Sequence, residues 1–104
     1  MRPNPIPIRL KEARKFAKLS QKELGIRAGI DENSASARMN QYEKGKHIPN
    51  VVMLRSMAKE LDVPMSYFFC EDQVSAEIVR CIGQLTQEDR EELLQQIISK
   101  LDLK

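Results

Sequence analysis

The segment over residues 21–45 constrains the fold of this chain more than any other. It holds two helix-forming runs separated by Gly29, and Gly45 follows the second run. Glycine readily adopts the left-handed backbone that commonly ends helices, so each of these glycines marks a helix end. The segment therefore predicts a helix, a turn and a second helix.

The first of these helices has a clear beginning, and the second does not. Ser20 and Glu23 have the spacing of a capping box, so the first helix is expected over residues 21–28. The second is expected to begin between residues 31 and 34, and its candidate N-caps are Asp31, Asn33, Ser34 and Ser36. Its inward stripe comprises Ala35, Met39 and Tyr42. The outer face then carries Asn33, Ser34, Ala37, Asn40, Gln41 and Lys44.

Helical periodicity continues on both sides of this segment. A helix over residues 8–18 has the apolar residues Leu10, Ala13, Phe16 and Ala17. Its basic outer face holds Arg9, Lys11, Arg14, Lys15 and Lys18. Beyond a basic loop, Asn50 caps a helix over residues 51–61 with the inward residues Val51, Leu54, Met57, Ala58 and Leu61. Pro64 then introduces a short helix at 65–69.

Two further helices are expected after residue 70. The helix over residues 71–85 presents Val74, Ile78, Val79, Ile82 and Leu85, and Thr86 with Asp89 resembles a capping box for a last helix at 87–101. The last helix carries Leu93, Leu94, Ile97, Ile98 and Leu101. This stripe is too apolar to remain in water. It must pack on the first domain or on another copy of the chain, and the second arrangement is favoured.

These patterns predict an all-α fold in three parts. Prolines 3, 5 and 7 predict an extended N-terminal arm over residues 1–7, in which Arg2 could reach a neighbouring DNA groove or belong to a frayed terminus. Residues 8–69 form a five-helix domain. Residues 70–104 form a C-terminal two-helix extension, which is expected to mediate dimerisation.

Charge is divided between the two halves of the chain. Residues 1–50 hold eleven Lys and Arg against five Asp and Glu, whereas residues 51–104 hold six against ten. The basic half favours a polyanionic partner and the acidic half another contact, commonly self-association; a mixed solvated surface is the alternative.

The same sequence offers little for catalysis or export. The only cysteines, Cys70 and Cys81, lack CxxC spacing and a nearby His, so no zinc site, disulfide framework, cofactor or enzymatic activity is expected. No apolar run reaches the ~18 residues of a membrane span, and no signal peptide is recognisable, which makes the cytoplasm the default location.

The outer face of the helix that follows Gly29 has the chemistry of a base reader. Asn40 and Gln41 carry amides that can hydrogen-bond both groups on the adenine edge in the major groove, while Ser34 and Ala37 are small enough for close approach to the bases. Around it, Gln21 at the start of the preceding helix could donate to a phosphate or brace the reading helix. The other candidate phosphate contacts are Lys22, Lys44, Lys46 and His47. Each of these residues could instead be merely solvated.

Several separated motifs occur in one order: LSQKEL at 19–24, AGI at 28–30, QYEKGK at 41–46 and DVP at 62–64. The order resembles the XRE-like helix-turn-helix family of Cro and phage-repressor type, over residues 8–69. The resemblance implies a five-helix DNA-binding domain in a bacterial or phage regulator that acts as a dimer on a palindromic operator. It also implies a backbone-contacting Gln21 and the base-reading residues Ser36, Ala37, Asn40 and Gln41.

Two departures from the family pattern stand out. The segment DENSASARMN carries an insertion of about one helical turn, which could lengthen the reading helix, bringing Asn33 and Ser34 to DNA, or loop out. Gly25 replaces the usual Ala, and a close contact between the two helices would explain a small residue there.

The leading hypothesis is a sequence-specific transcriptional regulator, such as a repressor, that binds double-stranded DNA as a homodimer. An antitoxin-like protein-interaction module, whose C-terminal helices bind a partner protein, is the alternative.

Overall fold

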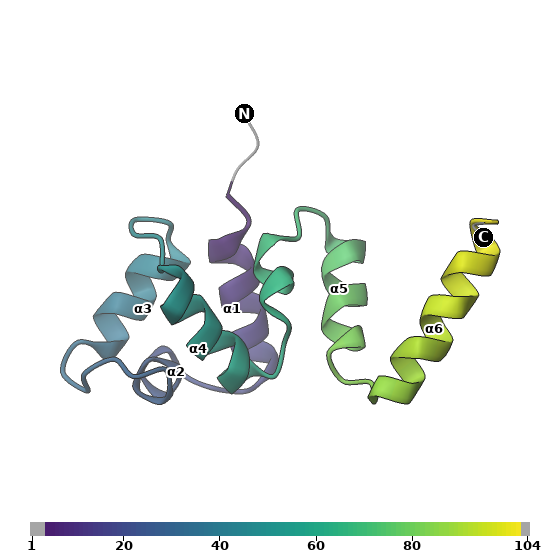
Figure 1. Cartoon of the computed structure of the whole chain (residues 1–104). Coiled ribbons are helices and arrows are strands. Elements are labelled where there is room, and N and C mark those ends of the chain that lie inside the picture. The colour runs from purple at the N-terminus through teal and green to yellow at the C-terminus, as the bar shows by residue number, and fades with distance from the viewer. Residues whose placement is uncertain (1–3, 103–104) are drawn as a thin grey trace.

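The structure, a computed structural model, describes residues 4–102 and is helical throughout its regular elements (Figure 1). The elements in order are α1 (Ile6–Phe16), α2 (Gln21–Arg27), α3 (Ala35–Glu43), α4 (Val51–Leu61), the 3₁₀ helix η1 (Met65–Phe69), α5 (Gln73–Ile82) and α6 (Gln87–Lys100). The predicted all-α fold, with a helix-turn-helix and two C-terminal helices, is confirmed.

Caps predicted from the sequence determine where four of the helices begin or end. Ser20 and Glu23 make both hydrogen bonds of the capping box at α2. Asn50 accepts from the backbone N–H of Met53 at 2.8 Å, and Thr86 accepts from that of Asp89 at 3.1 Å. Gly29 and Gly45 follow α2 and α3 with φ of 99° and 75°. A residue with a side chain would be strained at either glycine.

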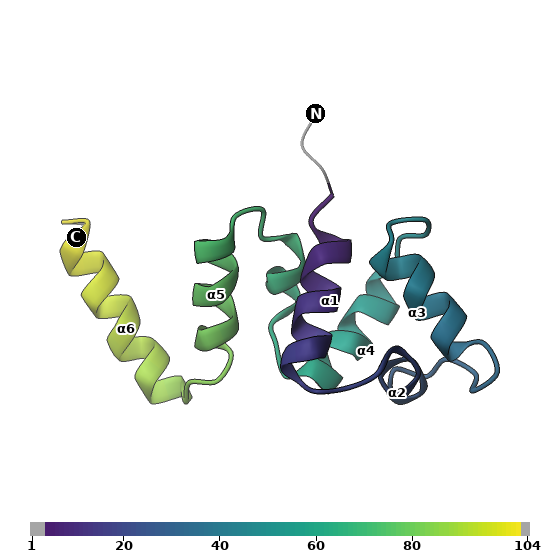
Figure 2. The same ribbon diagram turned by 180° about the vertical axis from the view of Figure 1, so that it is seen from behind.

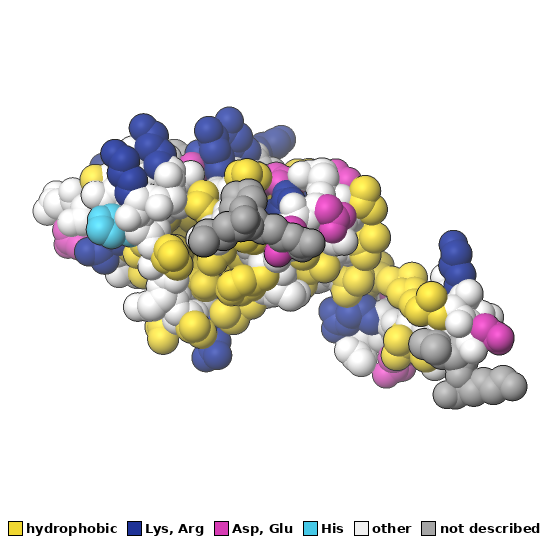
Figure 3. Space-filling model, turned by 90° about the horizontal axis from the view of Figure 1, so that it is seen from above, with side chains coloured by type: hydrophobic (Ala, Val, Ile, Leu, Met, Phe, Trp, Pro, Cys, Tyr) yellow, Lys and Arg dark blue, Asp and Glu magenta, His cyan; other side chains and the backbone are white. Residues whose placement is uncertain are grey.

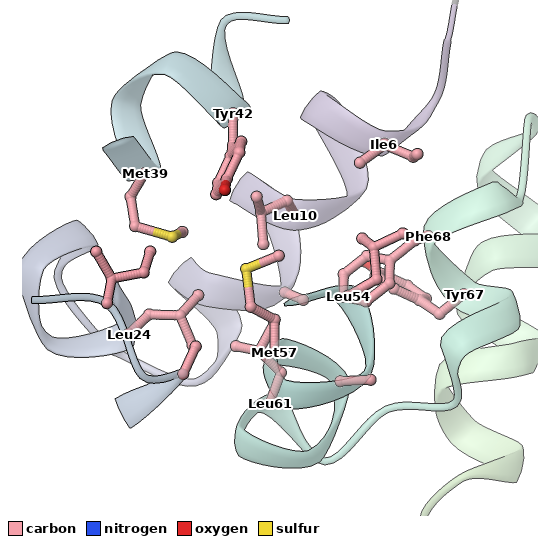
Figure 4. Packing of buried hydrophobic residues seen from close by; sticks show 14 of the residues in the cluster. Ile6, Leu10, Leu24, Met39, Tyr42, Leu54, Met57, Leu61, Tyr67 and Phe68 are labelled. Atoms are coloured by element: carbon pink, nitrogen blue, oxygen red, sulfur yellow. The ribbon is translucent and has the colours of Figure 1, made fainter. Parts of the chain in front are cut away.

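The core lies where α1, α2, α3, α4 and η1 meet (Figure 4). Its largest fully buried side chains are Tyr67, Phe68, Leu10, Leu24, Met39 and Met57. Burial of this many large apolar groups is the main stabilising contribution to a domain of this size, at about 1.5–3 kcal/mol per side chain. The helix-turn-helix is therefore supported from behind by α1 and α4.

The two C-terminal helices differ in how closely they pack on the rest of the chain. Ala76 of α5 is completely buried and the helix packs against η1. No residue of α6 is buried, and both ribbon views show this helix standing apart from the rest (Figures 1 and 2). Among the described residues, no helix is long and apolar enough to cross a membrane.

The N-terminal arm is shorter than predicted. Helix α1 begins at Ile6, so residues 6 and 7 are helical rather than extended. Pro7 lies in the first turn of the helix, where the backbone N–H that proline lacks would have no intrahelical partner. Asn4 supports this start by accepting the N–H of Ile6 at 3.0 Å. Arg2 and the first three residues of the predicted arm lie outside the described residues.

Several side chains lie elsewhere than the helical periodicity indicated. Ala17 was expected on the apolar face of the first helix and is exposed, and Arg14 was expected on its outer face but is only 12% exposed. Phe16 and Val51 were expected in the core but are 66% and 60% exposed. Phe16 lies instead beneath the guanidinium of Arg80 on α5, 4.0 Å from the ring centre. Arg9 was expected on the outer face but is only 4% exposed, because it donates to Glu12, to Gln73 and to the carbonyl of Cys70.

Candidate nucleic-acid interface

Helix α3 has one face in the core and one face outside. Ala35, Met39 and Tyr42 are buried as predicted, which fixes the rotation of the helix about its axis. Ser36, Ala37 and Arg38 consequently lie exposed, and Asn40 and Gln41 lie partly exposed beside them. The helix thus presents a continuous outer surface made of short, amide and basic side chains.

Helix α2 approaches α3 closely at Gly25. A Cβ built at this glycine would lie 2.9 Å from the Cβ of Ala35 and 3.1 Å from its carbonyl oxygen. The predicted close contact of the two helices is therefore present, and it is tight enough that even alanine would require a shift. The angle between α2 and α3 depends on this pair of small residues.

A buried ion pair joins α1 to the end of α3. Arg14 donates from Nε to Glu43 Oε2 at 2.6 Å and from Nη2 to Oε1 at 3.0 Å. The same guanidinium donates from Nη1 to the carbonyl of Leu19 at 2.9 Å. The Arg14 and Glu43 side chains are only 12% and 3% exposed. This two-point contact fixes the end of the outer helix relative to the core.

Gln21 braces α3. Its Nε2 donates to Glu43 Oε1 at 3.1 Å and to Asn40 Oδ1 at 3.4 Å. Of the two roles considered for Gln21, the bracing role is present in this structure. A phosphate contact by its side-chain amide stays a prediction, and it would require Gln21 to release one of these bonds.

The loop after α3 is hydrogen-bonded to the end of that helix. The backbone N–H groups of Lys46 and His47 both donate to the carbonyl of Gln41, at 2.9 and 3.4 Å. The loop and helix enclose a hollow of about 280 Å³, lined by Arg38, Gln41, Tyr42, His47 and Ile48. Lys44, Lys46 and His47 at the end of α3 and in this loop are all exposed.

Arg38 is the basic residue of this surface that the sequence reasoning left out. It is exposed on α3 and lines the hollow with Gln41 and His47. The sequence could have identified Arg38 as part of the outer surface. It lies between the exposed Ala37 and the buried Met39 and is the only charged side chain in the middle of the helix.

Residues 31–34, where the sequence pattern indicated an insertion, form a turn before α3 and are not part of that helix. The carboxylate of Asp31 accepts the N–H of Asn33 at 3.0 Å, and its carbonyl accepts that of Ser34 at 2.9 Å. Helix α3 then begins at Ala35, one residue after the latest start expected, with Ser34 at the N-cap position. Asn33 and Ser34 are exposed at the N-terminal end of the outer surface. Nearby, Lys22 pairs loosely with Glu32 at 3.9 Å.

A family model described as a helix-turn-helix domain matches residues 8–70. The chain belongs to this helix-turn-helix family. The match agrees with the XRE-like resemblance of the sequence motifs. Among solved structures, the chain is similar to that of the transcriptional regulator BswR, with 45% identity, a TM-score of 0.85, and coverage of 90% of this chain and 93% of the other. No curated protein matches the chain.

The predicted contacts thus lie on three parts of the helix-turn-helix domain. Ser36, Ala37, Asn40 and Gln41 lie on α3, Asn33 and Ser34 lie in the turn before it, and the basic residues lie at its borders. In a view from above, Lys and Arg side chains gather over this domain (Figure 3). Within residues 4–102, no group of three or more His, Cys, Asp or Glu is arranged to hold a metal ion.

Proposed function

We propose that this chain is a sequence-specific transcriptional regulator that binds double-stranded DNA through α3 in the major groove. One observation carries the proposal: α3 has a buried stripe and a polar outer surface, and the buried pair Arg14–Glu43 holds it on the domain. An α-helix matches the width of the major groove, where base edges present a distinct pattern of donors and acceptors. A fixed helix can present its side chains to these edges in one register.

The residues divide into two roles. Ser36, Ala37, Asn40 and Gln41 read bases from α3, and Asn33 and Ser34 add contacts from the turn before it. Lys22, Lys44, Lys46 and His47 contact phosphates at the borders, with Gln21 at the start of α2. Phosphate contacts give affinity that falls with salt, while base contacts give sequence preference.

The regulator acts as a homodimer joined by its C-terminal helices. Val74 and Ile78 of α5 and Leu94, Ile97 and Leu101 at α6 are large apolar side chains exposed to solvent. A second copy would cover this surface. Two copies related by a two-fold axis would place their α3 helices about 34 Å apart, one turn of DNA.

Selection of bound duplexes from a random DNA pool tests this function. The expected result is an enriched palindrome with half-sites one helical turn apart. Binding without an enriched motif would contradict sequence-specific regulation.

A second function is supported by α6 alone, which has no buried residue and carries acidic residues in its first turn. Such a helix could bind a different protein, as in an antitoxin-like module. Affinity purification from the native host, followed by measurement of the mass of the complex, separates the two: a homodimer supports self-association, and a stoichiometric foreign chain supports the module.

A further inference from the structure

A pocket of about 270 Å³ lies between α1, the end of α4 and α5, and no residue of α3 lines it. Its wall is mostly apolar, with Ala13, Phe16 and Ala17 from the end of α1 and with Leu61 and Val63 from the end of α4. Sites for small molecules are typically concave and mostly apolar, with a few polar groups, and enclose roughly 300–1,000 Å³. This pocket has that composition, and its volume suits a ligand at the small end of the range.

Two apolar residues at the end of α1 line this pocket and are not covered by the core. The helical periodicity of the sequence placed Phe16 and Ala17 on the apolar face of the first helix, yet both are exposed. Removing apolar surface from water is favourable, roughly in proportion to the area removed. A ligand with an apolar body would therefore gain free energy by covering Phe16 and Ala17.

Arg80 of α5 supplies a positive charge at the same pocket. Its guanidinium lies 4.0 Å from the centre of the Phe16 ring. Among residues 4–102, no ion pair includes Arg80. A guanidinium presents a planar fork of donors that matches a carboxylate, and it can stack on an aromatic ring at the same time. Arg80 can thus keep its contact with Phe16 and still bind a carboxylate in the pocket.

The pocket also has one acidic residue, Asp62. Asp62 is exposed, whereas Arg80 is partly buried. Water and salt screen exposed charges more strongly than partly buried ones. The positive charge of Arg80 therefore outweighs the negative charge of Asp62, and the pocket favours an anionic group.

Helix α5 is fixed across the pocket at both ends. Near its beginning, Ala76 is completely buried. Beyond its end, Gln84 donates from Nε2 to the backbone carbonyl of Asp62 at 2.8 Å, and Gly83 packs so closely on Pro64 that a Cβ on the glycine would lie 2.7 Å from the proline Cδ. These contacts preform the pocket, so a ligand would bind without the cost of moving α5.

We propose that this pocket binds a small carboxylic acid with an apolar body, whose carboxylate pairs with Arg80 and whose apolar part covers Phe16 and Ala17. The inference goes beyond the proposed function, because it assigns a ligand to the junction between the helix-turn-helix domain and α5. It does not depend on how α3 contacts DNA.

Hexanoate is a suitable probe, and amide NMR spectra of the isotope-labelled full chain locate its binding. Saturable changes are expected at residues 13, 17, 80 and 84, with a dissociation constant of about 1 mM or tighter. Hexanamide has the same size without the charge and should bind about 10-fold more weakly or less. Hexylamine carries the opposite charge and should not compete with hexanoate.

Two variants test the two parts of the pocket separately. Arg80→Gln removes the charge from a partly exposed side chain and should weaken hexanoate binding by about 10-fold or more. Arg55→Gln is the matched control, because Arg55 is exposed on α4 and does not line the pocket. Ala17→Leu places a larger side chain in the pocket from an exposed position and should also weaken binding. Circular dichroism verifies the fold, and Ala17→Leu decides the matter if Arg80→Gln does not fold.

Each outcome supports or overturns the inference. Hexanoate binding at the pocket that weakens in Arg80→Gln or Ala17→Leu, and not in Arg55→Gln, supports it. The inference is overturned if hexanoate causes no saturable change at these residues, if both pocket variants bind it like the wild type, or if hexylamine binds more tightly than hexanoate. None of these measurements uses DNA, so their failure would leave the proposed function unaffected.

Discussion

Arg14 and Glu43 meet through two nitrogen–oxygen contacts of 2.6 and 3.0 Å, between the first helix of the domain and the end of α3. The pair is almost completely buried, so each charge depends on the other for its solvation. Their contact couples the position of the outer helix to the stability of the core.

Removing one member of this pair should be costly. Glu43→Ala would leave the Arg14 guanidinium buried without its carboxylate, and we expect the free energy of unfolding to fall by about 3 kcal/mol. Urea denaturation measures this loss. Glu32→Ala is the control, because its 3.9 Å pair with Lys22 is exposed and should contribute less than about 1 kcal/mol. Equal losses in the two variants would contradict a structural role for the buried pair.

The contact at Gly25 makes a second prediction. Gly25→Ala gains up to about 1 kcal/mol of helix propensity, but overpacking against Ala35 costs about 1–3 kcal/mol, so a net loss of about 1 kcal/mol is expected in thermal unfolding. The double variant Gly25→Ala with Ala35→Gly removes the 2.9 Å Cβ–Cβ clash and should be less destabilised than the two single effects added together. If the loss of stability in the double variant equals the sum of the losses in the two single variants, residues 25 and 35 do not interact.

Phosphate contacts can be recognised by their salt dependence. Lys46→Ala should weaken binding to specific and random duplexes alike, and should reduce the slope of log affinity against log salt by about 1. Titrations at three or more salt concentrations measure that slope. Lys59→Ala, an exposed lysine on α4, is the control. An unchanged slope in Lys46→Ala would remove this residue from the interface.

The exposed apolar side chains of α6 predict a change in assembly. Ile97→Glu should convert the proposed dimer to monomer in sedimentation velocity while the helix content, measured by circular dichroism, stays the same, because no residue of α6 is buried in the core. Gln95→Glu adds the same charge at an exposed polar position of that helix and should leave the dimer intact. If Ile97→Glu sediments like the wild type, the homodimer is held elsewhere.

A cap at α5 predicts a dependence of stability on pH. Hydrogen bonds from Ser75 lower the pKa of Asp72 below its usual value. A lowered folded-state pKa stabilises the fold above the unfolded-state pKa, about 3.9, and this contribution disappears as the pH falls through the folded-state value. Asp72→Asn retains a good cap but does not titrate. Denaturation at pH 7 and at pH 3 should show a smaller acid loss in Asp72→Asn than in the wild type.

Much of this fold follows from short-range sequence signals. Ser20, Asn50 and Thr86 cap the helices that they were predicted to cap, because a capping side chain bonds only to backbone two or three residues away. The inward stripe of Ala35, Met39 and Tyr42 likewise follows from helical spacing. The first residue of α3 was harder to predict. The carboxylate of Asp31 accepts the backbone N–H of Asn33, which stabilises a turn there, and the helix begins only after this turn.

Long-range contacts account for the errors at Arg9 and Phe16. Arg9 is buried because groups more than 60 residues away, Gln73 and the carbonyl of Cys70, accept its hydrogen bonds. Phe16 is exposed because its partner is Arg80 of α5 and not the core. In the site, exposure of Ala37 was predicted from the helical wheel, and Ser36 was named only by the family resemblance. The connection of Gln21 to Glu43 and Asn40 depends on how α2 lies against α3.

The most direct measurement of the central claim is the affinity for a duplex selected from a random pool relative to a scrambled duplex of the same length, at physiological salt. The account predicts that the wild-type chain prefers the selected duplex by at least about 10³-fold, and that Gln41→Ala lowers this ratio while binding to the scrambled duplex hardly changes. Equal affinity for the two duplexes, or a ratio that Gln41→Ala leaves unchanged, would contradict base reading by α3.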